Sequence, residues 1–181
     1  MSEELIFVIL DFAKKQYQVD NVKKVCNCIR SLYNDSSFKC LQEVGPYLLS
    51  ISSRNRFYSF LGNKVDRRLL GLMIISKAGF DNCWKHFRKF LLVKTEDGQE
   101  LYFRFYDPHV LKIFLPTCDE KQIIEFFGPV EKFIVEGDNG EEAIEFSHQN
   151  GVLKQKVLVV DDLFEKEGVR LLNENVHVDK Q

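Results

Sequence analysis

The sequence has little that would place the protein in a membrane or on nucleic acid. Its first long apolar run, LIFVIL at residues 5–10, follows two glutamates and is far shorter than the roughly 20 residues that a membrane-spanning helix needs. The formal net charge of -2 supplies no general attraction to a phosphate backbone. We therefore expect no signal peptide, no membrane partner and no nucleic-acid partner.

The sequence also lacks a disulfide or metal-binding pattern. Its five cysteines are an odd number without regular spacing, which, without an export signal, favours reduced thiols in a cytoplasm. Cys26 and Cys28 are closer together than the CxxC spacing of zinc knuckles, and no second pair follows at zinc-site distance. We expect a cytoplasmic protein with no metal and no other cofactor.

Recognisable active-site motifs are missing as well. The sequence contains no GxGxxG, no GxxxxGKS or GxxxxGKT and no GxSxG. Cys83 and His86 lie three residues apart on a predicted helix and could form a thiolate pair. However, Cys83 belongs to the apolar face of that helix, and no third group is placed to orient the histidine. The sequence therefore favours a protein that is not an enzyme.

Apolar and aromatic residues, by contrast, are abundant. Apolar residues make up 45% of the 181, and 16 are phenylalanines, which is enough to build one domain around a single core. Apolar runs predict strands at residues 5–11, 47–51, 69–76 and 130–137. Helical spacing and capping residues predict helices between Asp20 and Asn34, from Arg54 to Leu61, from Phe80 to Leu91, after Asp107 and after Asp119.

Two hairpins are predicted from turn residues. Asp97 and Gly98 separate KFLLVKT from LYFRFY, and Asn150 and Gly151 separate AIEFSH from VLKQKVLVV. In the second strand of the first hairpin, alternation predicts that Leu101, Phe103 and Phe105 face the core.

The order of these elements predicts an α/β or α+β fold, a single layered domain with a mixed β-sheet flanked by helices. A small C-terminal β-hairpin forms an appendage. Residues 1–136 would form the main domain. Residues 137–181 would add the hairpin and a short helix, packed on or extending the same domain.

Arg104 and Asp107 are the polar residues whose role is most open. Arg104 can stack on Tyr102 or Tyr106 and pair with a carboxylate such as Asp107 or Glu125, which would make it part of the frame. Asp107 fits a helix N-cap, with Pro108 at the first helical position. The alternative is a small hydrolase or transferase that uses Arg104 and Asp107 in a cleft.

Residues 84–136 carry a series of motifs that resembles one family. FRFYDP at 103–108, LP at 115–116 and FGPV at 127–130 occur in order, and the series resembles the bacterial type VI secretion adaptor or chaperone family. LIFVILD and VGPYLL near the start are similar to the family's opening strands. We assign six of these residues to a structural signature: Arg104, Tyr106, Asp107, Pro108, Gly128 and Pro129.

The resemblance implies a binding function without catalysis. Such adaptors bind a toxic effector protein in the cytoplasm of the producing cell and help to load it onto the spike protein of the valine-glycine repeat type. Exposed aromatic and arginine side chains are the usual anchors of protein interfaces. One predicted helix is both aromatic and basic, and it supplies the partner-binding candidates Arg54, Arg56, Phe57, Tyr58 and Phe60. The alternative is that two of these rings lie in the core.

Overall fold

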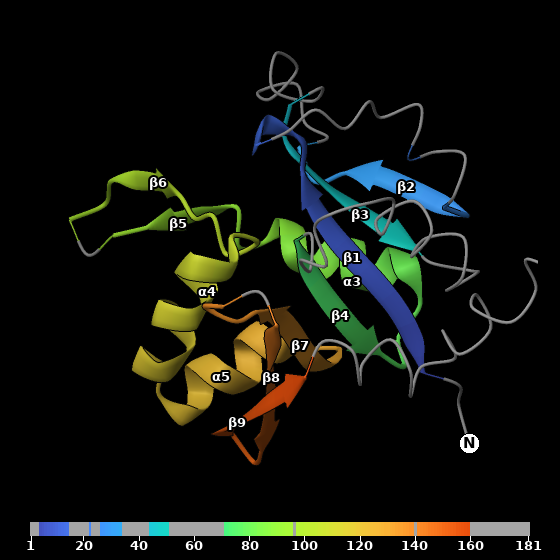
Figure 1. Cartoon of the computed structure of the whole chain (residues 1–181). Coiled ribbons are helices and arrows are strands. Elements are labelled where there is room, and N and C mark those ends of the chain that lie inside the picture. The colour runs from blue at the N-terminus through green and yellow to red at the C-terminus, as the bar shows by residue number, and fades with distance from the viewer. Residues whose placement is uncertain are drawn as a thin grey trace, which may run out of the picture.

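The computed structural model describes residues 4–14, 22, 26–33, 44–50, 71–95, 97–139 and 141–159. These residues form a seven-stranded sheet with helices against one face, and a separate two-stranded hairpin stands away from it (Figure 1). The sheet runs in the order β2 (Cys28–Ser31), β3 (Pro46–Ser50), β1 (Leu5–Asp11), β4 (Leu72–Ser76), β7 (Val130–Glu136), β8 (Glu142–Gln149) and β9 (Val152–Val159). The hairpin consists of β5 (Leu92–Lys94) and β6 (Glu100–Tyr102).

Three α-helices and two short 3-10 turns complete the described elements. They are α3 (Phe80–Arg88), α4 (Pro108–Phe114), α5 (Glu120–Phe127), η1 (Phe12–Lys14) and η3 (Leu115–Thr117). In this described part of the chain, no helix has the length and apolar character that crossing a bilayer requires.

The strand β1 lies inside the sheet because its side chains are apolar on both faces. It pairs with β3 on one side and β4 on the other. Phe7 and Ile9 point to the face that the helices cover, while Ile6 and Val8 belong to a second apolar cluster on the opposite face. The continuous run LIFVIL therefore forms a strand buried on both sides, as predicted.

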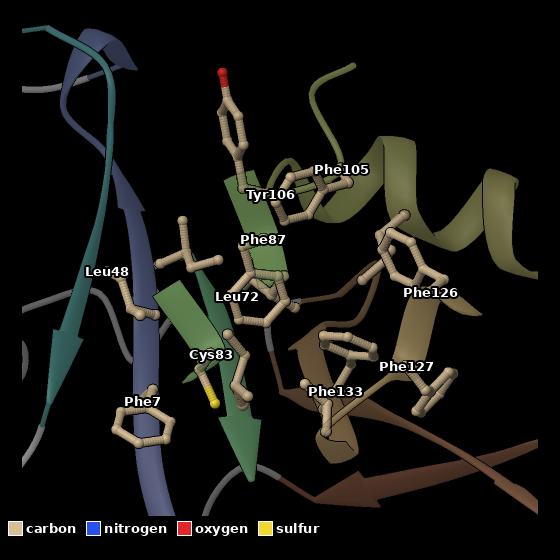
Figure 2. Close-up of a cluster of buried hydrophobic side chains, with 14 of the residues drawn as sticks. Phe7, Leu48, Leu72, Cys83, Phe87, Phe105, Tyr106, Phe126, Phe127 and Phe133 are labelled. Carbon is tan, nitrogen blue, oxygen red and sulfur yellow. The ribbon is translucent and has the colours of Figure 1, made fainter. Parts of the chain in front are cut away.

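Phenylalanine rings fill the space between the sheet and the helices. Phe87 of α3 stacks on Phe105 with ring centroids 5.7 Å apart, and Phe126 of α5 lies 5.4 Å from Phe133 of β7. Figure 2 shows these rings converging from helices and strands that are distant in the sequence. Such ring pairs add about 0.5–1.5 kcal/mol each beyond the apolar area that they bury. The core thus joins α3 and α5 to the sheet.

The predicted α+β architecture, with a helix-flanked sheet and a C-terminal hairpin, is confirmed. One detail is corrected, since every pair of described strands is antiparallel and the parallel pairs of a mixed sheet are absent there. The C-terminal hairpin extends the main domain, one of the two predicted arrangements, because β8 pairs with β7 and continues the main sheet.

The helix predicted between Asp20 and Asn34 is wrong at its C-terminal end. Residues 28–31 instead form β2, which pairs with β3. Ile29 packs in the cluster on one face of the sheet, whereas Arg30 lies 4.8 Å from the centroid of the Trp84 ring of α3 on the other. This alternation has the period of a strand, and pairing with β3 overrides the helical spacing of the apolar residues.

Three smaller predictions are corrected or lie outside the described residues. β6 ends at Tyr102, so the alternation does not continue through FRFY, and Leu101 is exposed although Phe105 is buried. The helix predicted over residues 54–61 and the one near the C-terminus fall outside the described residues.

Gly128 ends α5 at a point where the chain passes close to α3. Its φ of 49° is in the region that favours glycine, and its amide donates to the carbonyl of Ile124. A Cβ at this position would overlap the His86 ring, with Nδ1 only 2.7 Å away. The glycine is therefore required both by the backbone angle and by the packing.

We expect Gly128→Ala to lower the free energy of unfolding by about 2–4 kcal/mol, because backbone strain and overpacking add. Urea denaturation monitored by circular dichroism measures this change. The matched control is Gly79→Ala, since Gly79 has a negative φ and an added Cβ there meets no atom within 4 Å. A Gly128→Ala variant as stable as the Gly79→Ala variant would contradict the assignment.

Candidate functional site

A pocket lies where the end of β1 meets the segment between β6 and α4. Its volume is about 500 Å³, which is within the range of pockets that hold small ligands or side chains of a partner. Eight residues line it: Asp11, Ala13, Tyr33, Val44, Gly45, Tyr102, Arg104 and Tyr106. Three of the eight are tyrosines, and the lining has one cation and one carboxylate.

The backbone of the FRFYDP segment explains why alternate residues reach the pocket and the core. After β6, the amide of Phe103 donates to the carbonyl of Leu91 at 3.0 Å, and the amide of Asp107 donates to the carbonyl of Arg104 at 2.9 Å. The resulting turn directs Phe105 into the aromatic core and leaves Arg104 facing outward. A six-residue motif therefore builds one wall of the pocket and part of the core beneath it.

Arg104 joins two carboxylates that come from distant parts of the chain. Its Nη2 lies 3.1 Å from Oδ2 of Asp11 and 3.7 Å from Oδ2 of Asp107. The Arg104 side chain is 47% exposed, whereas those of Asp11 and Asp107 are 10% and 13% exposed. The predicted pair with Asp107 is present, and Arg104 also ties the end of β1 to the start of α4.

Both carboxylates also accept hydrogen bonds from backbone amides. Asp11 accepts a hydrogen bond from the amide of Ala13 at 3.1 Å, and Asp107 accepts one from the amide of His109 at 3.0 Å. Asp107 is therefore the N-cap of α4, with Pro108 at the first helical position, as the sequence predicted. Hydrogen bonds and the arginine together fix both side chains.

Two tyrosines contact each other beside the ion pair. The hydroxyl groups of Tyr33 and Tyr106 are 3.3 Å apart, and both side chains are buried. Burial, followed by the hydrogen bond to Tyr33, raises the pKa of Tyr106 far above the usual value of a phenol. Figure 2 shows its ring at the margin of the core, with the hydroxyl pointing away from the phenylalanines. This wall of the pocket is aromatic, and the phenol of Tyr106 in it stays neutral.

The signature residues therefore separate into two places. Arg104, Tyr106 and Asp107 meet around the pocket, and Pro108 follows them at the start of α4. Gly128 packs on His86, and the carbonyl of Pro129 accepts a 2.6 Å hydrogen bond from Ser76 Oγ. The partner-binding candidates Arg54, Arg56, Phe57, Tyr58 and Phe60 lie outside the described residues.

One member of the pocket was missed in the sequence. Asp11 closes the first apolar run, but its partner Arg104 lies 93 positions away. Only the placement of β1 beside the β6–α4 segment brings the two together. A carboxylate at the end of a buried strand is the single local signal that points to it.

Cys83 and His86 do not form an activated pair. Cys83 Sγ lies 3.5 Å from Ser76 Oγ, and burial raises the pKa of this thiol. His86 Nε2 donates to the carbonyl of Phe126 at 2.8 Å, and burial lowers the pKa of its imidazole. A thiolate–imidazolium pair needs a lowered thiol pKa and a raised imidazole pKa. Both side chains instead pack in the core.

Within residues that the structure describes, no group of three or more His, Cys, Asp or Glu side chains comes close enough together to hold a metal ion. At the pocket, the carboxylates of Asp11 and Asp107 share one cation, Arg104.

Comparisons with known proteins give one match. The model of a family described as a domain of unknown function (DUF4123) matches residues 6–125. This range includes β1 from its second residue, the FRFYDP segment and the first six residues of α5. Neither the search of curated proteins nor the search of solved structures finds a match.

We expect Arg104→Ala to lower the free energy of unfolding by about 1–2 kcal/mol, because two largely buried carboxylates lose a shared cation. Arg104→Lys should fall between this variant and the original protein, since lysine keeps the charge but not the planar fork. Urea denaturation at pH 7 measures the difference. Unchanged stability in Arg104→Ala would show that the ion pairs do not hold the frame.

The lowered pKa of His86 predicts a loss of stability in acid. The unfolded state binds a proton near pH 6.5, and the folded state binds one only at lower pH. Stability should therefore fall as pH drops below about 6.5, by at most about 1.4 kcal/mol per pH unit. His86→Gln, although less stable overall, should lack this part of the pH dependence when unfolding is measured from pH 7.5 to 5. A wild-type slope equal to that of His86→Gln would exclude the histidine as its source.

Proposed function

Because the chain belongs to the DUF4123 family, we propose that it is an effector adaptor, or chaperone, of a bacterial type VI secretion system. It binds a toxic effector in the cytoplasm and helps to load it onto the spike protein of the valine-glycine repeat type. Two features support this proposal. The motif series at residues 84–136 resembles those adaptors, and it overlaps the stretch that the family model matches.

The structural support for the proposal comes from the pocket at the FRFYDP segment. Its charged groups are already paired with one another and the phenol of Tyr106 is neutral, whereas the Tyr102 ring is 56% exposed at the pocket. Such a lining suits the apolar or aromatic side chain of a partner protein better than it suits bond-breaking chemistry. The adaptor accordingly works by binding, without catalysis.

The β5–β6 hairpin extends this surface beyond the pocket. Tyr102, at the end of β6, lines the pocket and is 56% exposed, and Leu92 and Leu101 are also exposed on the hairpin. In Figure 1 the hairpin projects from the body of the molecule. A segment of the effector lies along the hairpin and inserts one side chain into the pocket, where Tyr102 and Arg104 act as anchors.

A small hydrolase or transferase is the second candidate, and the presence of Arg104 in a pocket is the observation that favours it. Catalysis there would require the guanidinium to leave Asp11, or Asp107 to give up its cap of α4. Each step exposes a largely buried carboxylate without its partner, which costs free energy. The adaptor requires neither change and is therefore preferred.

The direct test is co-purification with the protein encoded by the neighbouring toxin gene. We expect the tagged adaptor to retain this effector and Tyr102→Ala to reduce retention about tenfold or more, because tyrosines at interface centres are frequent hot spots. Ile124→Ala is the matched control, since Ile124 is similarly exposed but lies on α5. Phe57→Ala tests the predicted contact site over residues 54–60 in the same assay.

Three results of this experiment would count against the proposal. The first is that the original protein retains no effector. The second is equal retention by Tyr102→Ala and Ile124→Ala, which would exclude the pocket as the contact surface. Turnover of a small molecule that depends on Arg104 would favour the second candidate.

A further inference from the structure

The strand β9 ends the sheet on the side away from β2. Its one strand neighbour among the described elements is β8, with which it pairs along its whole length. A terminal strand of this kind presents backbone donors and acceptors to any extended chain that approaches. The strand also lies beyond the part of the sequence that the family model matches.

The turn between β8 and β9 determines which backbone groups face outward. Asn150 and Gly151 both have positive φ, 52° and 84°, and form a two-residue turn between Gln149 and Val152. In such a hairpin the pair that flanks the turn exchanges both hydrogen bonds, and every second pair along the strands does the same. Val152, Lys154, Lys156 and Leu158 therefore bond to β8. The backbone groups of Leu153, Gln155, Val157 and Val159 point away from β8, to the side where the described residues supply no further strand.

The side chains of β9 are exposed on both faces of the sheet. Lys154 and Lys156 lie on one face, and Val157 and Val159, which are 56% and 53% exposed, lie on the face that carries Ile144. The strand VLKQKVLV has no acidic residue. Its exposed edge thus offers two positive charges on one side and two apolar side chains on the other.

We propose that β9 is a docking edge for an extended, acidic segment of a partner protein, which adds to the sheet as an antiparallel strand. Resting on the proposed adaptor function, this assigns the segment to the effector. Glutamates or aspartates of the segment oppose Lys154 and Lys156, and its apolar residues oppose Val157 and Val159. Read from its N-terminus, the segment has the pattern apolar, any, apolar, acidic, any, acidic.

The same two lysines disfavour a second copy of this chain as the occupant. If two β9 edges paired antiparallel around Gln155, the register would place Lys154 opposite Lys156 of the other copy in both directions. Like charges at directly opposite positions are destabilising, and natural sheets protect their edges with lysine in this way. In this register, the lysines therefore disfavour self-association and favour an acidic strand.

The probe is a fluorescent ten-residue peptide that contains Val-Thr-Val-Glu-Thr-Glu, so that its side chains match β9 in the antiparallel register. A second peptide has lysine in place of both glutamates. Binding to the full chain is measured by fluorescence anisotropy at fixed salt. We expect saturable binding of the acidic peptide and at least tenfold weaker binding of the lysine peptide.

Two variants test separately how backbone hydrogen bonding and lysine charge contribute to peptide binding. Gln155→Pro removes an outward N–H without affecting a bond to β8, and Gln155→Ala is the matched control that keeps the N–H. We expect Gln155→Pro to weaken binding about tenfold and Gln155→Ala to leave it unchanged. Lys154→Glu, at an exposed position opposite Ser147, should weaken binding of the acidic peptide and strengthen binding of the lysine peptide. This second test does not require the strand to tolerate a proline.

Two outcomes would overturn the docking edge. Equal affinity of Gln155→Pro and Gln155→Ala for the acidic peptide would show that surface charge, and not backbone hydrogen bonding, accounts for the binding. Sedimentation that shows a dimer of the original chain but a monomer of Gln155→Pro would make a second copy the occupant.

The effector assay separates this proposal from the adaptor function. If the effector is retained equally by the original protein and by Gln155→Pro, the adaptor function stands and the docking edge is wrong. If no effector is retained but the acidic peptide binds with the expected variant pattern, the edge stands and the adaptor function is wrong.

Discussion

The arrangement of the pocket depends on the contact of Arg104 with Asp11 and Asp107. The two carboxylates are nearly buried, one at the end of β1 and the other at the start of α4, and one guanidinium lies between them. Without the cation, two like charges would remain in a poorly solvated place. The ion pair thus fixes the end of the central strand against the helical layer, and the aromatic lining is assembled around it.

Below this contact, alternate residues of one short segment face the core and the pocket. Phe103 and Phe105 pack with Phe126 in the aromatic core, whereas Arg104 and Tyr106 line the pocket. The polar groups of the pocket are strongly paired within the protein. In the adaptor function that we propose, such a pocket positions a partner by shape and apolar burial.

Local patterns in the sequence predicted most of the elements and little of their arrangement. The apolar run of β1, the Asp107 and Asp119 caps and the Asn150–Gly151 turn are each specified by adjacent residues, and all are present. The sequence predicts a helix where β2 lies, because the apolar residues there fit the period of a helix as well as that of a strand. Only the pairing with β3 decides for the strand. Asp11 and Arg104 meet only through tertiary packing, so no spacing in the sequence could reveal the site.

The FRFYDP segment has a consequence for how such a protein can diverge. Nearly every side chain in it has a neighbour inside the fold: a ring in the core, a carboxylate across the ion pair, or the first amides of α4. Substitutions are therefore costly at this motif. Exposed side chains of the β5–β6 hairpin and of β9, such as Leu101 and Val157, can change with less effect on the packing of the fold.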